Sequence, residues 1–190
     1  MVRIVILLLL ATTAVAEAAD VLLLRRDRLI VDARAAPRGA STIVVREGRI
    51  SAILDGIDAR PEAAAGDVVR EIDLRGRSVL PGLVDSHVHL TSDPATPWWR
   101  EAIDTPERAA IIGVRNAALT VRAGFTTVRD LGGSGGAPFA LRDAIAAGVV
   151  IGPRVLAAGQ PVSIIGGHGD VNGFRPEVTA VLSSGNTCTG

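Results

Sequence analysis

Apolar and polar positions follow a strand-like pattern through the first part of the chain. From Asp20 to Leu80, short apolar or alternating runs are separated by loops rich in glycine, proline and alanine. Such runs are typical of β-strands. Residues 46–48 (Arg-Glu-Gly) have the composition of a hairpin turn. The pattern predicts a small β-sandwich-like subdomain over residues 20–80, with strands at 20–24, 29–31, 42–45, 49–54 and 68–74.

The pattern changes at Pro81-Gly82, and the first helix after this point has clear end signals. Thr105 suits an N-cap, Pro106 suits the first helical position, and Gly124 suits the position after the C-cap. These signals predict a helix that ends at about Arg122. Its buried stripe is expected to consist of Ile111, Val114, Ala118 and Val121.

Strands and helices alternate through the rest of the chain. The expected elements are a strand beginning at Leu83, strands at 125–128 and 154–157, and a second helix from about 138 to 147. Short connections between parallel strands favour right-handed βαβ units. A closed (β/α)8 barrel needs eight strands and about 250 residues. Residues 81–190 are therefore predicted to form the first three βα units of an incomplete TIM-type barrel. No helix or strand is predicted after Asn186, and the sequence is interpreted as the front portion of a larger protein.

Residues 1–19 have the organisation of a secretory signal peptide. Arg3 supplies a positive charge, an apolar run begins at Val5, and residues 14–16 (Ala-Val-Ala) form a small-x-small cleavage site. A retained membrane anchor is the alternative, but the uncharged stretch is shorter than the ~20 residues that cross a bilayer. The mature protein is therefore predicted to be exported, periplasmic or secreted, with no membrane attachment after cleavage.

Composition argues against several classes of partner. Lys and Arg together number 20 and equal the 20 Asp and Glu, so no net field favours nucleic acid or an anionic membrane. Tyrosine is absent and aromatic residues make up 3%, which disfavours stacking on bases. The one cysteine, Cys188, excludes an internal disulfide and is expected to stay free or to pair outside the chain.

Two histidines give the strongest chemical signal. His87 and His89 are two residues apart on a predicted strand, so their side chains share one face about 6.5 Å apart along the strand axis. Val88 between them faces the other way. Chemistry in α/β barrels is found at the ends of strands, and neutral imidazole is a ligand of zinc, manganese or iron. The pattern favours a divalent metal site. Two ordinary histidines at a strand end are the alternative.

The segment that contains these histidines, residues 79–90 (VLPGLVDSHVHL), resembles the first barrel strand of the amidohydrolase superfamily. Residues 48–53 resemble the hairpin of the small β-domain that precedes this strand. Residues 123–133 and 152–159 resemble the second and third strands. The resemblance runs from about Asp20 to Gly173. It is strongest to imidazolonepropionase-like and prolidase-like members, which open cyclic amides or cleave dipeptides and acyl-amino acids.

The resemblance implies roles for particular residues. His87 and His89 would bind the more buried of one or two divalent ions, with zinc as the preferred assignment. His168, in a glycine-rich loop, would face the substrate and either polarise the scissile carbonyl or bind a carboxylate. A loop histidine without a role is the alternative. Asp130 ends a strand, and its expected role is structural: it would cap Gly132-Gly133 or bind an arginine.

Other residues that the family uses are absent from the sequence. The family supplies a carboxylated lysine or a glutamate, two further histidines and a proton-transferring aspartate from later strands. This chain has no lysine and only three histidines. The catalytic residues are therefore expected beyond Gly190, and the chain alone is expected to bind metal poorly and to be inactive.

The resemblance implies hydrolysis of a C–N bond by metal-activated water, in a dipeptide, an acyl-amino acid or a cyclic amide. A non-catalytic exported fragment, or a binding remnant of the same fold, is the alternative. The expected partner is a small-molecule or dipeptide substrate. A homo-oligomer is one assembly open to the full-length protein.

Overall fold

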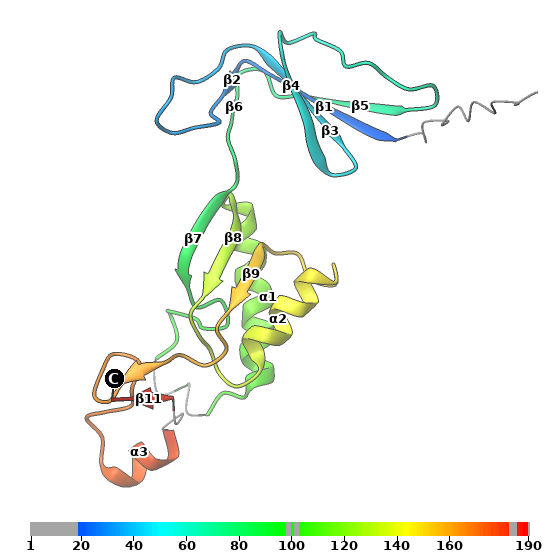
Figure 1. Ribbon diagram of the computed structural model, residues 1–190. Helices are drawn as coiled ribbons and strands as arrows, with labels where there is room; N and C mark the ends of the chain where they lie inside the picture. The colour runs from blue at the N-terminus through cyan, green and yellow to red at the C-terminus, as the bar shows by residue number, and fades with distance from the viewer. Residues whose placement is uncertain (1–18, 98–99, 101–102, 183–185, 190) are drawn as a thin grey trace, which may run out of the picture. The chain divides into compact units, whose positions relative to one another are not determined.

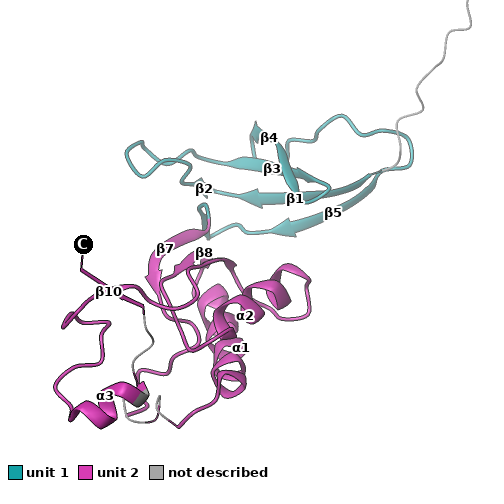
Figure 2. Ribbon diagram, turned by 60° about the horizontal axis from the view of Figure 1, so that its bottom comes forward, with its two compact units in different colours: residues 1–81 teal, residues 82–190 magenta. Residues whose placement is uncertain are grey.

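The computed structural model describes residues 19–97, 100, 103–182 and 186–189. The predicted signal peptide therefore lies outside the described residues, apart from Ala19. Contacts divide the chain into two compact units, Met1–Pro81 and Gly82–Gly190 (Figures 1 and 2). No described helix has both the length and the apolar character needed to cross a membrane.

The first unit is built from β-strands. Its main sheet has the strand order β4-β3-β1-β5, in which β1 pairs antiparallel with β3 and parallel with β5 (Figure 1). A second, two-stranded sheet pairs β2 with β6. The strands span Asp20–Arg26 (β1), Arg28–Leu29 (β2), Ser41–Arg46 (β3), Arg49–Asp55 (β4), Val68–Asp73 (β5) and Ser78–Val79 (β6). The predicted N-terminal β-structure is thus present as one four-stranded and one two-stranded sheet among the described residues.

The predicted hairpin turn joins β3 to β4. Arg46 pairs with Arg49, which leaves a two-residue loop of Glu47 and Gly48. Both loop residues have positive φ, 49° and 72°, as a type I′ hairpin turn requires. Buried Val21, Leu23 and Val44 then form the core of this unit, with Ala52 and Leu54 packed against them.

A buried carboxylate ties the β5 end of the first unit together. Asp67 accepts hydrogen bonds from the backbone N–H groups of Ala19 and Ala64 and from the Arg46 guanidinium, at 3.1, 3.0 and 2.8 Å. Its side chain is only 1% exposed. The Arg46 hydrogen bond, followed by the two backbone bonds, lowers the pKa of Asp67 below its ordinary value of 3.8.

This lowered pKa is expected to make the first unit sensitive to acid. A carboxyl group with a lower pKa in the folded state stabilises folding above its unfolded pKa, and this contribution is lost as the pH falls through the folded pKa. We therefore expect the protection of β1 and β3 amides from hydrogen exchange to fall from pH 4 downward. Asp67→Asn is expected to lower protection at pH 5 and to flatten its pH dependence. An equally steep acid dependence in Asp67→Asn would contradict this assignment.

The second unit contains the predicted parallel βα units. Strands β7 (Leu83–Val88), β8 (Phe125–Asp130) and β9 (Arg154–Ala157) pair in parallel in the order β7-β8-β9. Helices α1 (Pro106–Arg122) and α2 (Ala137–Ala146) connect them and cover one face of the sheet (Figure 1). Thr105 caps α1, and Gly124 follows its C-cap with φ of 98°, as predicted.

The last part of the second unit differs from the prediction. After β9 come β10 (Ser163–Ile164), α3 (Pro176–Leu182) and β11 (Thr187–Cys188). The prediction of no element after Asn186 was wrong, because β11 pairs in parallel with β10. Two-residue strands are too short to show a period in the sequence, so only the pairing of distant segments reveals them.

The buried stripe of α1 also differs from the prediction. The buried residues are Ala109, Gly113 and Ala117, whereas Ile111 is 72% exposed and Val114 is 41% exposed. A Cβ atom on Gly113 would lie 2.8 Å from Cδ2 of Leu141 on α2. Gly113 of α1 therefore lies directly against the Leu141 side chain of α2, which leaves no room for a larger residue at position 113. Leu90, Val128 and Val155 from the strand side complete a core with Ala117 and Leu141.

Candidate metal site

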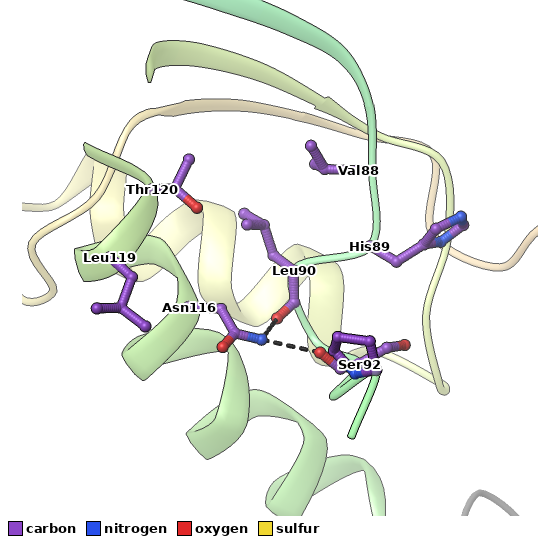
Figure 3. A pocket seen from close by; sticks show the side chains of 8 residues that line it. Val88, His89, Leu90, Ser92, Asn116, Leu119 and Thr120 are labelled. Atoms are coloured by element: carbon purple, nitrogen blue, oxygen red, sulfur yellow. Dashed lines mark hydrogen bonds between the residues drawn. The ribbon is translucent and has the colours of Figure 1, made fainter. Parts of the chain in front are cut away.

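His87 and His89 lie side by side at the carboxyl end of β7. Their ring centroids are 5.4 Å apart, with an edge-to-face angle of 69°. Both residues are exposed, whereas Leu90 belongs to the helix-side core and Val88 packs against it. Figure 3 shows the His89 ring on the opposite side of the backbone from Val88 and Leu90. The two imidazoles thus share one side of the strand. Their role as metal ligands stays a prediction.

The strand is irregular where His87 lies. Asp85 is opposite Val128 and Val88 is opposite Asp130, so β7 has one more residue than β8 between these pairs. Such a β-bulge changes the direction of side chains along a strand. The Asp85 carboxylate accepts the backbone N–H of His87 at 3.0 Å. This hydrogen bond holds the backbone of the bulge at His87.

The His89 ring is held by a backbone carbonyl. Its Nδ1 atom lies 2.8 Å from the carbonyl oxygen of Gly132, just after β8. Because a carbonyl oxygen can only accept, this bond assigns the proton to Nδ1 and leaves Nε2 with a free lone pair. Metal-binding histidines are commonly held by such a bond to their other nitrogen. The chemistry of this donor set therefore fits a divalent ion.

Gly132 can present this carbonyl because it lacks a side chain. Its φ of 145° lies in a region that L-residues rarely adopt. A Cβ atom there would lie 2.7 Å from the backbone nitrogen of Pro161. The position of the carbonyl beside His89 thus depends on glycine at this residue.

Asp130 has the structural role that its position predicted. The side chain is fully buried. Its Oδ1 accepts the N–H of Gly132 and its Oδ2 accepts the N–H of Leu90, each at 2.9 Å. Asp130 therefore caps the turn at Gly132, as expected, and also joins the end of β8 to the end of β7. The hydrogen bond from the Leu90 N–H was not predicted from the sequence.

The structure does not bring His168 to the other two histidines. His168 is exposed in the loop after β10, where the Gly166 N–H donates to Asp170 Oδ2 at 2.7 Å. Within the described part of the chain, no group of three or more His, Cys, Asp or Glu side chains could hold a metal ion. The predicted substrate contact of His168 stays a prediction. Cys188, on β11, is exposed and free.

A cavity of about 280 Å³ lies on the other side of β7 from the imidazoles. Its lining includes Val88, Leu90, Asn116, Leu119 and Thr120 (Figure 3). His89 borders the cavity, but its ring points away from it. Asn116 donates from Nδ2 to the carbonyls of Leu90 and Ser92, both at 2.8 Å, and so holds the segment after His89. The role of Asn116 was not predicted from the sequence. The one signal for it is that asparagine is disfavoured in a helix interior.

Comparison with known proteins identifies the family of the chain. The model of the Amidohydrolase family matches residues 78–184. A dihydroorotase of Anaeromyxobacter sp. (strain K) is 35% identical over 94 residues, which cover 50% of this chain and 20% of that protein. An imidazolonepropionase of Symbiobacterium thermophilum is 41% identical over 66 residues, which cover 35% of this chain and 15% of that protein.

A solved structure extends the likeness to both units. It is a crystal structure of a Xaa-Pro dipeptidase with bound methionine in the active site, with a TM-score of 0.68 and 35% sequence identity. The match covers 83% of this chain and 38% of the dipeptidase chain, so this chain spans well under half of that protein. The family model alone covers more than half of the 190 residues. The chain belongs to the amidohydrolase family.

Proposed function

We propose that the full-length protein is a metal-dependent amidohydrolase that cleaves the C–N bond of a dipeptide. The observation that carries this proposal is the pair of imidazoles, 5.4 Å apart, at the carboxyl end of the first parallel strand. The likeness to a Xaa-Pro dipeptidase supports a dipeptide over the cyclic amides that the names of the other relatives suggest, because it extends over 83% of this chain.

We also propose that the three parallel strands belong to a (β/α)8 barrel. Active sites of such barrels lie at the carboxyl ends of the strands, where His87 and His89 are. The two imidazoles would supply two of the three or four protein ligands that zinc usually has. Residues beyond Gly190 would supply the other ligands and the proton-transferring carboxylate.

The three histidines of the chain would have different roles at this site. A bound divalent ion would act as a Lewis acid on the amide carbonyl and on water. His89 would hold the ion through Nε2, and His87 would hold it through one of its ring nitrogens. His168 would contact the substrate, at the scissile carbonyl or at the carboxylate of the dipeptide. Its exposure and its loop, held by the Gly166–Asp170 bond, are compatible with this role.

The proposal is tested with the full-length, zinc-loaded protein. Xaa-Pro dipeptides, N-acyl-amino acids and cyclic amides such as dihydroorotate are offered in parallel, and we expect turnover of the dipeptides. His168→Ala is expected to lower kcat/KM about 100-fold, the effect of losing one polar contact to a reacting carbonyl. Arg175→Ala, an exposed residue nearby in the sequence, is the control. Turnover of none of these substrates by the zinc-bound protein would favour the alternative of a binding remnant.

We further propose that the protein is exported and that a signal peptide within residues 1–19 is removed by cleavage after about Ala16. The apolar run after Arg3 and the small residues at 14–16 support this proposal. N-terminal sequencing of protein recovered from the periplasm or the medium is expected to show a start near Glu17. Recovery of intact Met1 in the cell membrane would indicate the retained anchor instead.

A further inference from the structure

One buried carboxylate, that of Asp130, connects the end of β8 to the backbone after His89 and, through Gly132, to the His89 ring. Asp130 Oδ2 accepts the N–H of Leu90, the residue directly after His89, at 2.9 Å. Asp130 Oδ1 accepts the N–H of Gly132 at 2.9 Å, and the carbonyl of Gly132 holds His89 Nδ1 at 2.8 Å. The Asp130 side chain therefore fixes the backbone that follows His89 and the residue that orients the His89 ring.

The backbone around Asp130 makes this connection rigid. The N–H of Leu131 donates to the carbonyl of Val88 at 3.0 Å, and the N–H of Ala158 donates to the carbonyl of Asp130 at 2.9 Å. These bonds join the carboxyl end of β8 to the carboxyl ends of β7 and β9. The side chain is fully buried there, so no water competes for its oxygens. A shift of Asp130 would therefore move the Gly132 carbonyl and the His89 backbone together.

We infer that Asp130 is a positioning residue for the metal site: through Gly132 and Leu90 it sets the tautomer and the direction of the His89 imidazole. This inference rests on the proposed function, because it assigns a task to His89 as a metal ligand. Asp130 does not touch the ion or the substrate. It acts through the two residues that hold His89.

The alternative is that Asp130 only stabilises the fold, and a second buried carboxylate provides the control. Asp67 also accepts two backbone N–H groups and is almost completely buried, but it belongs to the other compact unit. Asp→Asn at either residue replaces an accepting oxygen by an NH2 group that faces a donor. Both variants are expected to lower stability. Only Asp130→Asn is expected to weaken metal binding.

The experiment measures zinc affinity in the full-length protein by competition with a chromophoric chelator, at a temperature where circular dichroism shows each variant folded. Asp130→Asn is expected to bind zinc about 10- to 100-fold more weakly, as is usual when a group behind a metal ligand is changed. It is also expected to alter the visible spectrum of the Co²⁺-substituted protein. Asp67→Asn is expected to leave both unchanged. Equal zinc affinity in Asp130→Asn and wild type would overturn the inference while the proposed function stood.

A measurement on the unaltered protein covers the case in which Asp130→Asn does not fold. Nitrogen-15 NMR of the zinc-loaded protein with labelled histidine is expected to show His89 with its proton on Nδ1. A proton on Nε2 would overturn the inference, because the Gly132 carbonyl would then not orient the ring. If the wild type bound no zinc at all, the proposed function would fail, and with it this inference.

Discussion

Replacement of His87 by alanine is expected to remove the divalent metal from the full-length protein. His87 and His89 share one side of β7, and the loss of one imidazole leaves the other as the only ligand from this strand. Changing a residue that holds a metal ligand lowers metal affinity ~10- to 100-fold. Because His87→Ala removes a ligand itself, we expect zinc affinity to fall by more than this. Hydrolysis is expected to fall with it. Metal content after dialysis and kcat/KM with added zinc measure the two effects.

The chain offers a matched control for this substitution. It has three histidines, and the third, His168, lies in an exposed loop and forms no potential metal-holding group with the pair among the described residues. His168→Ala is expected to keep the metal content of the wild type and to affect turnover only. If His87→Ala retained full metal stoichiometry, the metal assignment would be wrong. Equal metal loss in both variants would instead indicate general unfolding.

Leu141→Ala is expected to cause the largest loss of stability in the second unit. Leu141 is 2% exposed and packs with Leu90, Ala117, Val128 and Val155 between α2 and the sheet. Truncation of a buried leucine costs about 2–5 kcal/mol, because the apolar contacts are lost and a cavity remains. Urea unfolding, with hydrogen exchange of β8 amides to assign the loss to this unit, measures the effect.

Two further variants test whether packing is the cause. Leu119→Ala, on an α1 residue that is 56% exposed, is expected to change the unfolding free energy by less than about 1 kcal/mol. Gly113→Ala is expected to destabilise the wild type, because its Cβ would lie 2.8 Å from Leu141 Cδ2. In the Leu141→Ala background, the same methyl group is expected to recover part of the loss. Strictly additive effects of the two substitutions would show that this contact does not limit the helix spacing.

The candidate site was predictable where it depends on neighbours along the chain. The His87-Val88-His89 spacing placed two imidazoles on one side of a strand, and the structure has them so. The two hydrogen bonds that hold the His89 ring and the residue after it were not predictable. One joins the His89 ring to the Gly132 carbonyl across 43 residues of the chain, and the other joins the Leu90 N–H to Asp130 across 40 residues. A backbone carbonyl also leaves no mark in the residue pattern, since every residue has one.

The amino-acid sequence alone determined the strand and helix periods, the capping of α1 by Thr105, the turn at Glu47-Gly48 and the pairing of His87 with His89 on one side of a strand. All of these depend on residues within a few positions of one another. The tertiary structure alone decided that α1 buries Ala109 and Gly113 rather than Ile111, that β11 pairs with β10, and that Asp130 holds the ends of two strands. The physical reason is that burial and hydrogen-bond partners depend on which distant segments approach, and how closely.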